Sequence, residues 1–490
     1  YKTMIRSSFA EKKSVFIVLP SELDMKNFEG VLSKGIEDFT FVIHNDIGDK
    51  KIIDKTEKIL KSAHPILILG TAQFLSIPRL DIGTIIVEHE NSNIYKMMTK
   101  PYIDLRIFAE IYASKINAKF ILGDNLLRFE SINKKDNNNW SEINNLSFRI
   151  NFSGEIKILS KSEKFKILED ETIDKITNTI QKKKSVFIFA LRKGFATMTI
   201  CKDCNQTLNC EKCLAPVVLY LSKDGKKRMF SCNRCKIEIK SEITCKYCGG
   251  WNLLPLGIGT DTVYEEIKKH FPKVKIFKID KEIAKTKIGA KKIIKEFEEN
   301  PGSILIGTEM AFFYLREKVR LSIIASFDSL WSIPNFKMGE KIIQIILSMI
   351  DKTEKEIIIQ TKNEKDGALK AIVYENLLSF VREELEDRKK LSYPPYKRFI
   401  KITHIGRKEE MQDAREVLKK IFNEYNPEIF SGFIAHNKGM YATNMLIKKV
   451  INNWSLPELI AGSTIDESLL KKIISLPPIF KTEVDPEDLL

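Results

Sequence analysis

The sequence lacks any run of about 18 uncharged apolar residues, so no segment is expected to cross a membrane as a helix. It also lacks a signal-like apolar stretch, and it opens with Tyr1-Lys2-Thr3 instead of a methionine. We therefore expect a fragment of a longer protein that is not secreted. With 43% hydrophobic and 30% charged residues, the chain is not of a disordered, collagen-like or disulfide-stapled class. Its 490 residues allow roughly three domains.

Acidic residues are fewer than basic ones, which leaves a net charge of +15 at neutral pH. Such an excess favours a polyanionic partner such as DNA or RNA. The alternative is a general bias of the source towards lysine, which greatly outnumbers arginine here. Charge alone does not decide between the two.

Cysteine is absent except between Cys201 and Cys248, where eight cysteines form four Cys-x-x-Cys pairs. A gap of two residues lets one tight turn aim two thiolates at a single tetrahedral ion, at about 2.3 Å. Eight thiolates make two closed four-cysteine sites without an open position for catalysis, so we predict two structural zinc ions per chain. The minor alternative is a redox role. The pairs are Cys201/Cys204, Cys210/Cys213, Cys232/Cys235 and Cys245/Cys248.

The spacing of the pairs favours a nested arrangement. Five residues separate Cys204 from Cys210, too few for an easy return between partner pairs. Eighteen residues separate Cys213 from Cys232 and include the polar turn 222–225, enough for a β-hairpin that brings those two pairs together. The outer pairs would then close the other site. A cross-braced arrangement remains the alternative.

Short apolar runs alternate with amphipathic stretches on both sides of the cysteines. This pattern predicts βαβ units around parallel sheets, in two consecutive α/β blocks. The asparagine-rich stretch 136–139 is expected to be a surface linker, and 484–486 an edge strand stopped by proline. Expected helices are 52–63 and 105–115; expected strands are 14–20, 65–70, 84–87, 120–123, 185–190, 274–277, 303–307, 322–325 and 356–359.

These residues resemble one family, primosomal protein N′, the PriA replication-restart DNA helicases. The resemblance is carried by the order and spacing of several motifs over nearly the whole chain. They are Arg192-Lys193-Gly194-Phe195, the four cysteine pairs, Gly257-Ile258-Gly259-Thr260-Asp261, Gly307-Thr308-Glu309-Met310, Ile359-Gln360-Thr361, Tyr393-Pro394-Pro395-Tyr396 and Val484-Asp485-Pro486.

The resemblance implies an α/β fold with two RecA-like lobes of the superfamily 2 helicase type. It also implies a two-zinc insertion in the second lobe, with the nested pairing, and a small mixed α/β C-terminal domain. The expected parts are lobe 1 at 1–135 with a truncated or degenerate start, a linker and the start of lobe 2 at 136–197, the zinc-binding insertion at 198–256, the remainder of lobe 2 at 257–377 and the C-terminal domain at 378–490.

By resemblance, the partners would be branched or forked DNA, primosome proteins, single-stranded-DNA-binding protein and the replicative helicase, in the cytoplasm at the nucleoid. Family members unwind DNA 3′ to 5′ with ATP and Mg²⁺, and their aromatic-basic loop near the DNA path aligns with Tyr95 and Lys96. For these two residues, simple packing is the alternative to base stacking. The basic residues of the zinc module that are expected to be exposed could contact DNA or a protein partner. The alternative is that the module has a structural role alone. These residues are Lys202, Lys226, Lys227, Arg228, Arg234 and Lys236.

The nucleotide motifs depart from the family. Its phosphate loop ends in Gly-Lys-Thr, which leaves Lys2 and Thr3 as nucleotide ligands, but Tyr1 replaces the glycine and would crowd the phosphates. The family's Asp-Glu-Glu-His aligns with 88–91. Glu88 could still hold Mg²⁺ through a water, whereas His89 replaces the acid that orients the attacking water.

Three further elements are replaced. Ser-Ala-Thr-Pro becomes Asp124-Asn125-Leu126-Leu127, and the two arginines of Gln-x-x-Gly-Arg-x-Gly-Arg become Ser348 and Asp351. A Lys-Gly pair becomes Phe313-Tyr314. We therefore predict a PriA-like restart protein that binds forked DNA and supports primosome assembly without hydrolysing ATP at a helicase-like rate, and no catalytic residue is assigned. The alternatives are an active helicase with an unusual phosphate loop upstream of Tyr1, and a zinc-stabilised protein-binding scaffold.

Overall fold

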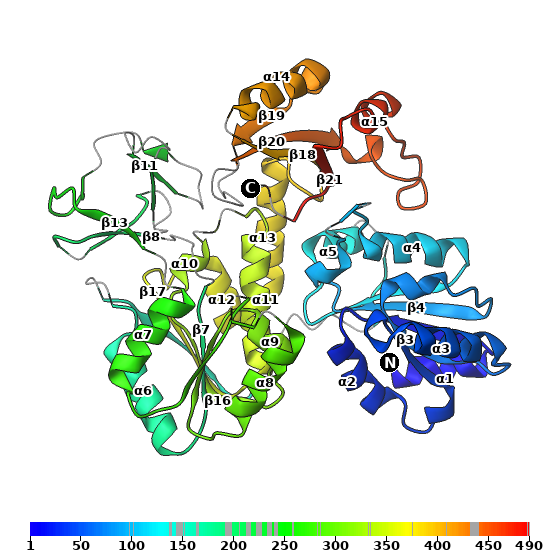
Figure 1. Ribbon diagram of the computed structural model, residues 1–490, viewed down its shortest axis with the longest axis horizontal. Helices are drawn as coiled ribbons and strands as arrows, with labels where there is room; N and C mark the ends of the chain where they lie inside the picture. The colour runs from blue at the N-terminus through cyan, green and yellow to red at the C-terminus, as the bar shows by residue number, and fades with distance from the viewer. Residues whose placement is uncertain are drawn as a thin grey trace. The chain divides into compact units, whose positions relative to one another are not determined.

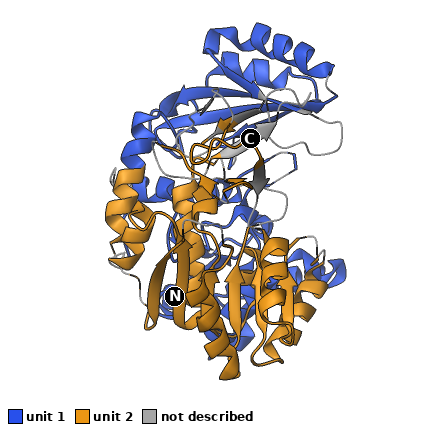
Figure 2. Ribbon diagram, turned by 90° about the vertical axis from the view of Figure 1, so that its left-hand side faces the viewer, with its two compact units in different colours: residues 1–143, 385–490 blue, residues 144–384 orange. Residues whose placement is uncertain are grey.

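A computed structural model describes most of the chain, and its residues fall into two compact units (Figure 2). Unit 1 comprises Tyr1–Ile143 and Leu385–Leu490, and unit 2 comprises Asn144–Glu384. The described residues are 1–97, 99–100, 102–136, 140–143, 150, 152–162, 166–191, 198–204, 206–211, 217–221, 228–232, 238–239, 244–256, 259–281, 283–284, 286–331, 333, 335–374, 376–407, 409–431, 441–487 and 489.

The first part of unit 1 is a parallel sheet in the order β2-β3-β1-β4-β5 with helices on both faces (Figure 1). Its strands read as continuous apolar runs because alternate side chains are buried on opposite faces. Val15 and Ile17 join one core cluster, and Phe16 and Val18 the other. The elements are α1 (Lys2–Ala10), β1 (Ser14–Val18), α2 (Glu22–Leu32), β2 (Thr40–Ile43), α3 (Asp49–Lys61), β3 (Leu67–Gly70), β4 (Ile82–Glu88), α4 (Leu105–Lys115), β5 (Lys119–Gly123) and α5 (Phe129–Asp136).

Unit 2 contains a second parallel sheet, in the order β14-β15-β7-β16-β17-β6. Its strands are β6 (Glu155–Ser160), β7 (Val186–Phe189), β14 (Ile276–Ile279), β15 (Ile304–Gly307), β16 (Val319–Ile324) and β17 (Thr353–Thr361). Its helices are α6 (Asp170–Gln181), α7 (Thr260–His270), α8 (Lys287–Glu298), α9 (Met310–Tyr314), α10 (Asp328–Trp331), α11 (Met338–Asp351), α12 (Gly367–Val373) and α13 (Leu377–Lys390), the last of which ends in unit 1.

The cysteine-rich insertion lies between β7 and α7 and forms two small antiparallel sheets, β13-β8-β9 and β10-β11-β12. Strands β10 and β11 pair antiparallel, which confirms the hairpin predicted between the second and third cysteine pairs. The strands are β8 (Met198–Cys201), β9 (Thr207–Leu208), β10 (Val218–Leu221), β11 (Arg228–Ser231), β12 (Glu238–Ile239) and β13 (Leu253–Leu256).

The C-terminal part of unit 1 is an antiparallel sheet in the order β19-β20-β18-β21, with a core built around the buried Ile400 and Met445. Strand β21 ends at Val484 and lies at the edge of the described sheet, next to β18. The edge strand predicted at 484–486 therefore lies earlier in the chain and overlaps the prediction at Val484 alone. The elements are β18 (Lys397–Gly406), α14 (Glu410–Phe422), β19 (Glu428–Ser431), β20 (Tyr441–Val450), α15 (Glu467–Ile474) and β21 (Phe480–Val484).

The predicted fold class is confirmed: two parallel α/β sheets, a cysteine-rich insertion after the first strands of the second block, and a small mixed C-terminal domain. The strand expected at 274–277 begins two residues later, at Ile276. Helix α1 was not predicted, although Lys2 and Thr3 form its first turn. Residues 137–139 of the expected linker lie outside the described residues. Among those that are described, no helix is both long and apolar enough to span a membrane.

Candidate functional sites

Four cysteines of the insertion converge on one point. The sulfur atoms of Cys201, Cys204, Cys245 and Cys248 all lie within 4.8 Å of one another. The Sγ–Sγ distances are 3.6 Å for Cys201 to Cys248 and 3.6 Å for Cys204 to Cys245. Four thiolates at about 2.3 Å from one tetrahedral ion would be about 3.8 Å apart, so this donor set fits a metal such as zinc. The outer pairs therefore come together, as the nested arrangement requires.

The antiparallel pairing of β8 with β13 explains the convergence, because it places Cys201 opposite Leu253, a few residues after the last cysteine pair. The turn that carries this pair is held by hydrogen bonds within itself. The amide of Cys245 donates to the carbonyl of Gly250 (2.6 Å), and that of Gly249 donates to the carbonyl of Cys245 (2.7 Å). Gly249 has a φ of +72°, in the left-handed region that favours glycine.

Two backbone amides of the same turn point at sulfur. The Tyr247 amide donates to Cys245 Sγ and the Gly250 amide to Cys248 Sγ, both at 3.4 Å. Such donors favour the thiolate form that a metal requires. The backbone is thus arranged for bound thiolates rather than for an isolated pair of thiols.

The inner cysteine pairs are only partly described. Cys210 and Cys232 are buried in the same cluster as Leu208, Val217 and Phe230. Cys213 and Cys235 lie outside the described residues. The second four-cysteine site therefore stays a prediction.

The predicted nucleotide residues lie at the carboxyl edge of the first sheet. Lys2 and Thr3 are exposed in the first turn of α1, and Glu88 ends β4. The Tyr1 hydroxyl donates a hydrogen bond to the Glu88 carboxylate, and its ring lies 6.2 Å from that of Phe28. Burial raises the pKa of Glu88, opposed by this hydrogen bond. The carboxylate of Glu88, which the family resemblance assigns to Mg²⁺, thus accepts a hydrogen bond from the hydroxyl of Tyr1.

His89, which replaces the second acid, has a left-handed backbone conformation with a φ of +53°. Its Nε2 atom lies 3.6 Å from the Asp24 carboxylate, and its side chain is 42% exposed. An imidazole in this place lacks the permanent negative charge of the carboxylate that the family resemblance expects here.

Asp124 and Asn91 join the two loops that follow β5 and β4. The Asn91 amide donates to Asp124 Oδ2 (2.8 Å), the Asn125 amide donates to Asp124 Oδ1 (2.7 Å), and the Asn91 side-chain amide donates to the Leu126 carbonyl. Burial raises the pKa of Asp124 to about 6, against the lowering effect of the amides. The segments that align with two family motifs are therefore tied to each other.

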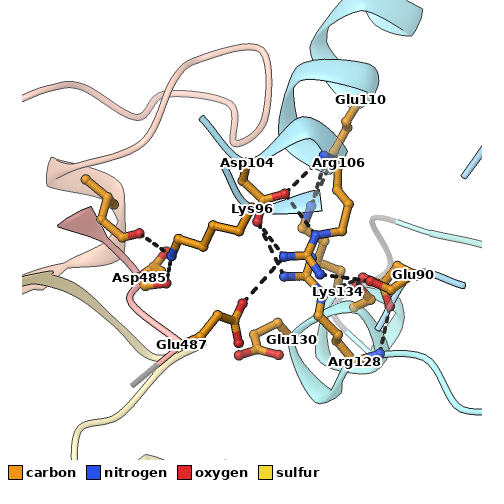
Figure 3. A network of polar contacts seen from close by, with 12 residues as sticks. Glu90, Lys96, Asp104, Arg106, Glu110, Arg128, Glu130, Lys134, Asp485 and Glu487 are labelled. Atoms are coloured by element: carbon orange, nitrogen blue, oxygen red, sulfur yellow. Dashed lines mark hydrogen bonds and ion pairs between the residues drawn. The ribbon is translucent and has the colours of Figure 1, made fainter. Parts of the chain in front are cut away.

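Glu90 is the centre of a buried polar network (Figure 3). Its carboxylate accepts hydrogen bonds from Arg128 Nε (2.6 Å), the Arg128 amide (2.7 Å) and Ser131 Oγ (2.7 Å). Its carbonyl accepts a hydrogen bond from the guanidinium of Arg106, which pairs with Asp104. Burial opposes ionisation of Glu90, but the charge and hydrogen bonds of Arg128 outweigh it and lower the pKa of this carboxyl.

Sequence reasoning did not identify Arg106, Arg128 or Ser131. They come from two helix starts that lie 16 to 41 positions away from Glu90, and no spacing rule relates them to it. The one local signal was Asp104, a typical helix N-cap that accepts the Arg106 amide hydrogen bond.

The predicted DNA-contact residues are packed inside unit 1. Tyr95 is 2% exposed, and its hydroxyl lies within hydrogen-bond distance of the carbonyls of Glu88 (2.6 Å) and Val18 (3.1 Å). Lys96 is 7% exposed, and its ammonium donates to the carbonyls of Val484 (3.0 Å) and Asp485 (Figure 3). These are the packing contacts of the alternative interpretation, while a DNA role for the two residues stays a prediction.

Comparison with known proteins gives sequence relatives of one kind. No model of a protein family matches the sequence. The replication restart protein PriA of Borreliella burgdorferi is 26% identical over 426 residues, covering 85% of this chain and 62% of that protein. PriA of Thermotoga maritima is 25% identical over 408 residues, covering 80% of this chain and 54% of that protein. The chain thus spans little more than half the length of these relatives.

Solved structures give weaker likenesses. The structure of RecG bound to a three-way DNA junction aligns with a TM-score of 0.38 and 8% identity, over 77% of this chain and 43% of RecG. Dbp5 of S. cerevisiae bound to RNA and ADP BeF3 aligns with a TM-score of 0.38 and 13% identity, over 77% of this chain and 76% of that chain. Scores this low carry no argument. What the comparisons show is a sequence similarity: as its motifs predicted, this chain resembles the replication restart proteins named PriA.

Proposed function

We propose that this protein is a PriA-like replication-restart factor that binds branched or forked DNA and supports primosome assembly in the cytoplasm, at the nucleoid. The relationship to PriA proteins over about four fifths of the chain supports this function. The net charge of +15 agrees with a DNA partner. Primosome proteins, single-stranded-DNA-binding protein and the replicative helicase are the proposed protein partners.

We further propose that the protein does not hydrolyse ATP at a helicase-like rate. The observation that carries this proposal is the hydrogen bond from the Tyr1 hydroxyl to Glu88. Phosphoryl transfer needs backbone amides close to the phosphates, a carboxylate on Mg²⁺ and an acid or amide that orients water. Here an aromatic side chain reaches the carboxylate, and His89 replaces the second acid.

The helix that aligns with the arginine motif supports the same proposal. Helix α11 has nine buried residues, among them Ile345, Ile346 and Met349, so it serves mainly as a core helix. Ser348 is half-buried, and Asp351 is the exposed last residue of the helix. Neither side chain can donate to a γ-phosphate as a guanidinium does, and loss of an arginine finger lowers the rate by roughly 10³ to 10⁵.

The four convergent cysteines would hold a structural zinc ion, and the inner pairs a second one. A closed four-thiolate site supplies folding energy and no reactive coordination position. The distances between the sulfur atoms and the two amides directed at them support the first site. A metal analysis that finds two zinc ions per chain is the result expected.

Two assays on the full-length protein test the proposed function. Titration with forked DNA at two salt concentrations should give binding that weakens steeply as salt rises, because phosphate contacts release counterions. ATP turnover should stay at background with and without that DNA. Absence of fork binding at low salt would favour the protein scaffold, and brisk DNA-stimulated turnover would establish the active helicase.

A further inference from the structure

Two large aromatic side chains are exposed on the turn that carries Cys245 and Cys248. Trp251 is 76% exposed and Tyr247 is 51% exposed. Tyr247 lies between Cys245 and Cys248, and Trp251 follows directly after the two glycines that close the turn. Among the insertion residues whose side chains the structure describes, no other large apolar side chain is exposed. Two aromatic rings on one short turn, without an apolar surround, indicate a specific contact rather than a general apolar interface.

The backbone that carries both rings is fixed. Besides the cysteine ligands at either end of the turn, the Leu253 amide donates to the Trp251 carbonyl (2.9 Å), and the Asn252 carbonyl accepts a hydrogen bond from the Lys202 amide (2.9 Å). A ring that is presented by a rigid backbone loses little conformational entropy when it binds a flat ligand, so such a turn is preorganised for stacking.

Basic side chains flank the rings. The Lys246 ammonium lies 5.4 Å from the centre of the Tyr247 ring and 3.2 Å from the Asn209 carbonyl. Lys202 is exposed on the strand end that pairs with the segment of Trp251. The neighbouring carboxylate, Asp203, accepts a hydrogen bond from the Asn252 side chain (3.2 Å), which partly offsets its repulsion of a phosphate.

We propose that Tyr247 and Trp251 form a stacking platform for unpaired bases of single-stranded DNA, with Lys246 and Lys202 beside the phosphates. Exposed rings interleaved with lysines are the combination that binds single strands without sequence preference. The bases of a duplex have their faces covered by their neighbours and cannot use such rings. A protein hot spot would be surrounded by further apolar groups. This inference depends on the proposed DNA binding. It assigns the binding of single-stranded DNA to the surface formed by Tyr247 and Trp251.

The test uses the full-length, zinc-loaded protein and a fluorescent oligothymidine of roughly 20 nucleotides, with a blunt duplex of equal length as the comparison. Stacking contributes about 1–3 kcal/mol per base, so Tyr247→Ala with Trp251→Ala should weaken single-strand binding at least tenfold and change duplex binding less than threefold. Tyr247→Phe with Trp251→Phe should stay within threefold of wild type. Tyr374→Ala is the matched control, because Tyr374 is 75% exposed in the same unit but outside the insertion.

A zinc measurement on each variant separates loss of a ring from loss of the site, and the phenylalanine variant keeps the test valid if the alanine variant loses metal. Equal single-strand binding by wild type and a zinc-loaded alanine variant would overturn the platform while leaving the proposed function intact. A wild-type protein that binds neither forked nor single-stranded DNA would instead overturn both. Weakening by Tyr374→Ala equal to that of the double alanine variant would also contradict the assignment to the turn.

Discussion

The cysteine site of unit 2 and the sheet edge of unit 1 both collect groups that suit a cation, yet their polar atoms are used differently. The four sulfur atoms face one another, and two of them also accept amide hydrogen bonds from their own turn. At the sheet edge, each carboxylate is directed to a donor of the protein: Glu88 to Tyr1, Asp124 to Asn91, and Glu90 to Arg128. The four sulfur atoms thus form a donor set that could hold a metal ion, whereas the three carboxylates each accept hydrogen bonds from the protein.

The comparison separates two kinds of resemblance to a family. The cysteines keep the residue types and the spacing, and the four outer ones also converge in space. The acidic segment keeps its place after β4, but its side chains now stabilise the loops of unit 1. An aligned position therefore carries an expectation from the family, and the hydrogen-bond partners show what the side chain contacts in this protein.

The largest expected effect comes from the convergent set. Cys201→Ser with Cys245→Ser should remove one zinc ion per chain and leave the insertion open to limited proteolysis, because a structural zinc contributes on the order of 10 kcal/mol of apparent folding free energy. Lys246→Ala, in the same turn, should retain the metal. Unchanged zinc content and protease resistance in the double serine variant would contradict the claim that the four convergent cysteines hold a structural zinc ion.

The next effect comes from Glu90. Replacement by alanine removes the carboxylate that contacts the mostly buried Arg128 guanidinium most closely and leaves it the Asp104 carboxylate 3.8 Å away. The free energy of unfolding of unit 1 should therefore fall by about 3–5 kcal/mol. Glu110→Ala is the matched control, because its ion pair with Lys134 is partly exposed and should contribute less than about 1 kcal/mol. Denaturant titration of both variants measures the difference. Equal losses would mean that Glu90 has no special structural role.

Lys96 should have an intermediate effect. Lys96→Met removes the donor that reaches two carbonyls at the end of β21, and should lower the free energy of unfolding by about 1.5–3 kcal/mol. Lys115→Met removes an exposed ion pair with Glu458 that also joins the first sheet domain to the C-terminal part, and should change the stability much less than Lys96→Met does. A salt-sensitive DNA-binding defect in Lys96→Met with unchanged stability would instead favour the DNA-contact role.

The smallest effect is a pH dependence at Asp124. Its pKa is raised to about 6 in the folded protein, above an unfolded value of about 4. Between these values the folded state binds more protons, so this group makes stability fall as pH rises from about 4 to about 6. Asp124→Asn should remove that fall, so the stability of the variant relative to wild type should rise as pH increases from about 4 to about 6. Parallel stability profiles for the two proteins would contradict the shift.

Much of the fold could be predicted because its signals are local. The apolar runs predicted as strands at 65–70 and 185–190 contain the buried strands β3 and β7. The cysteine spacing favoured a hairpin and the grouping of the outer pairs, with a cross-braced arrangement as the alternative. Helix α1 was missed because Lys2 and Thr3 were interpreted as the end of a phosphate loop. The residues that follow them, up to Ala10, were not considered as a helix.

The buried network could not be predicted, because Glu90, Arg106 and Arg128 meet only after the chain has folded. Likewise, no periodicity distinguishes an exposed Trp251 from a buried Tyr95. Burial depends on tertiary contacts, and only the structure supplies those.

The most direct test of the central claim is the ATP turnover of the full-length protein, measured with and without forked DNA under conditions where fork binding is saturated. If the sheet edge has become structural while the zinc-held frame remains, the protein will bind the fork and turnover will not rise above the background. Turnover that rises strongly on addition of the fork, at rates typical of a DNA helicase, would contradict the account.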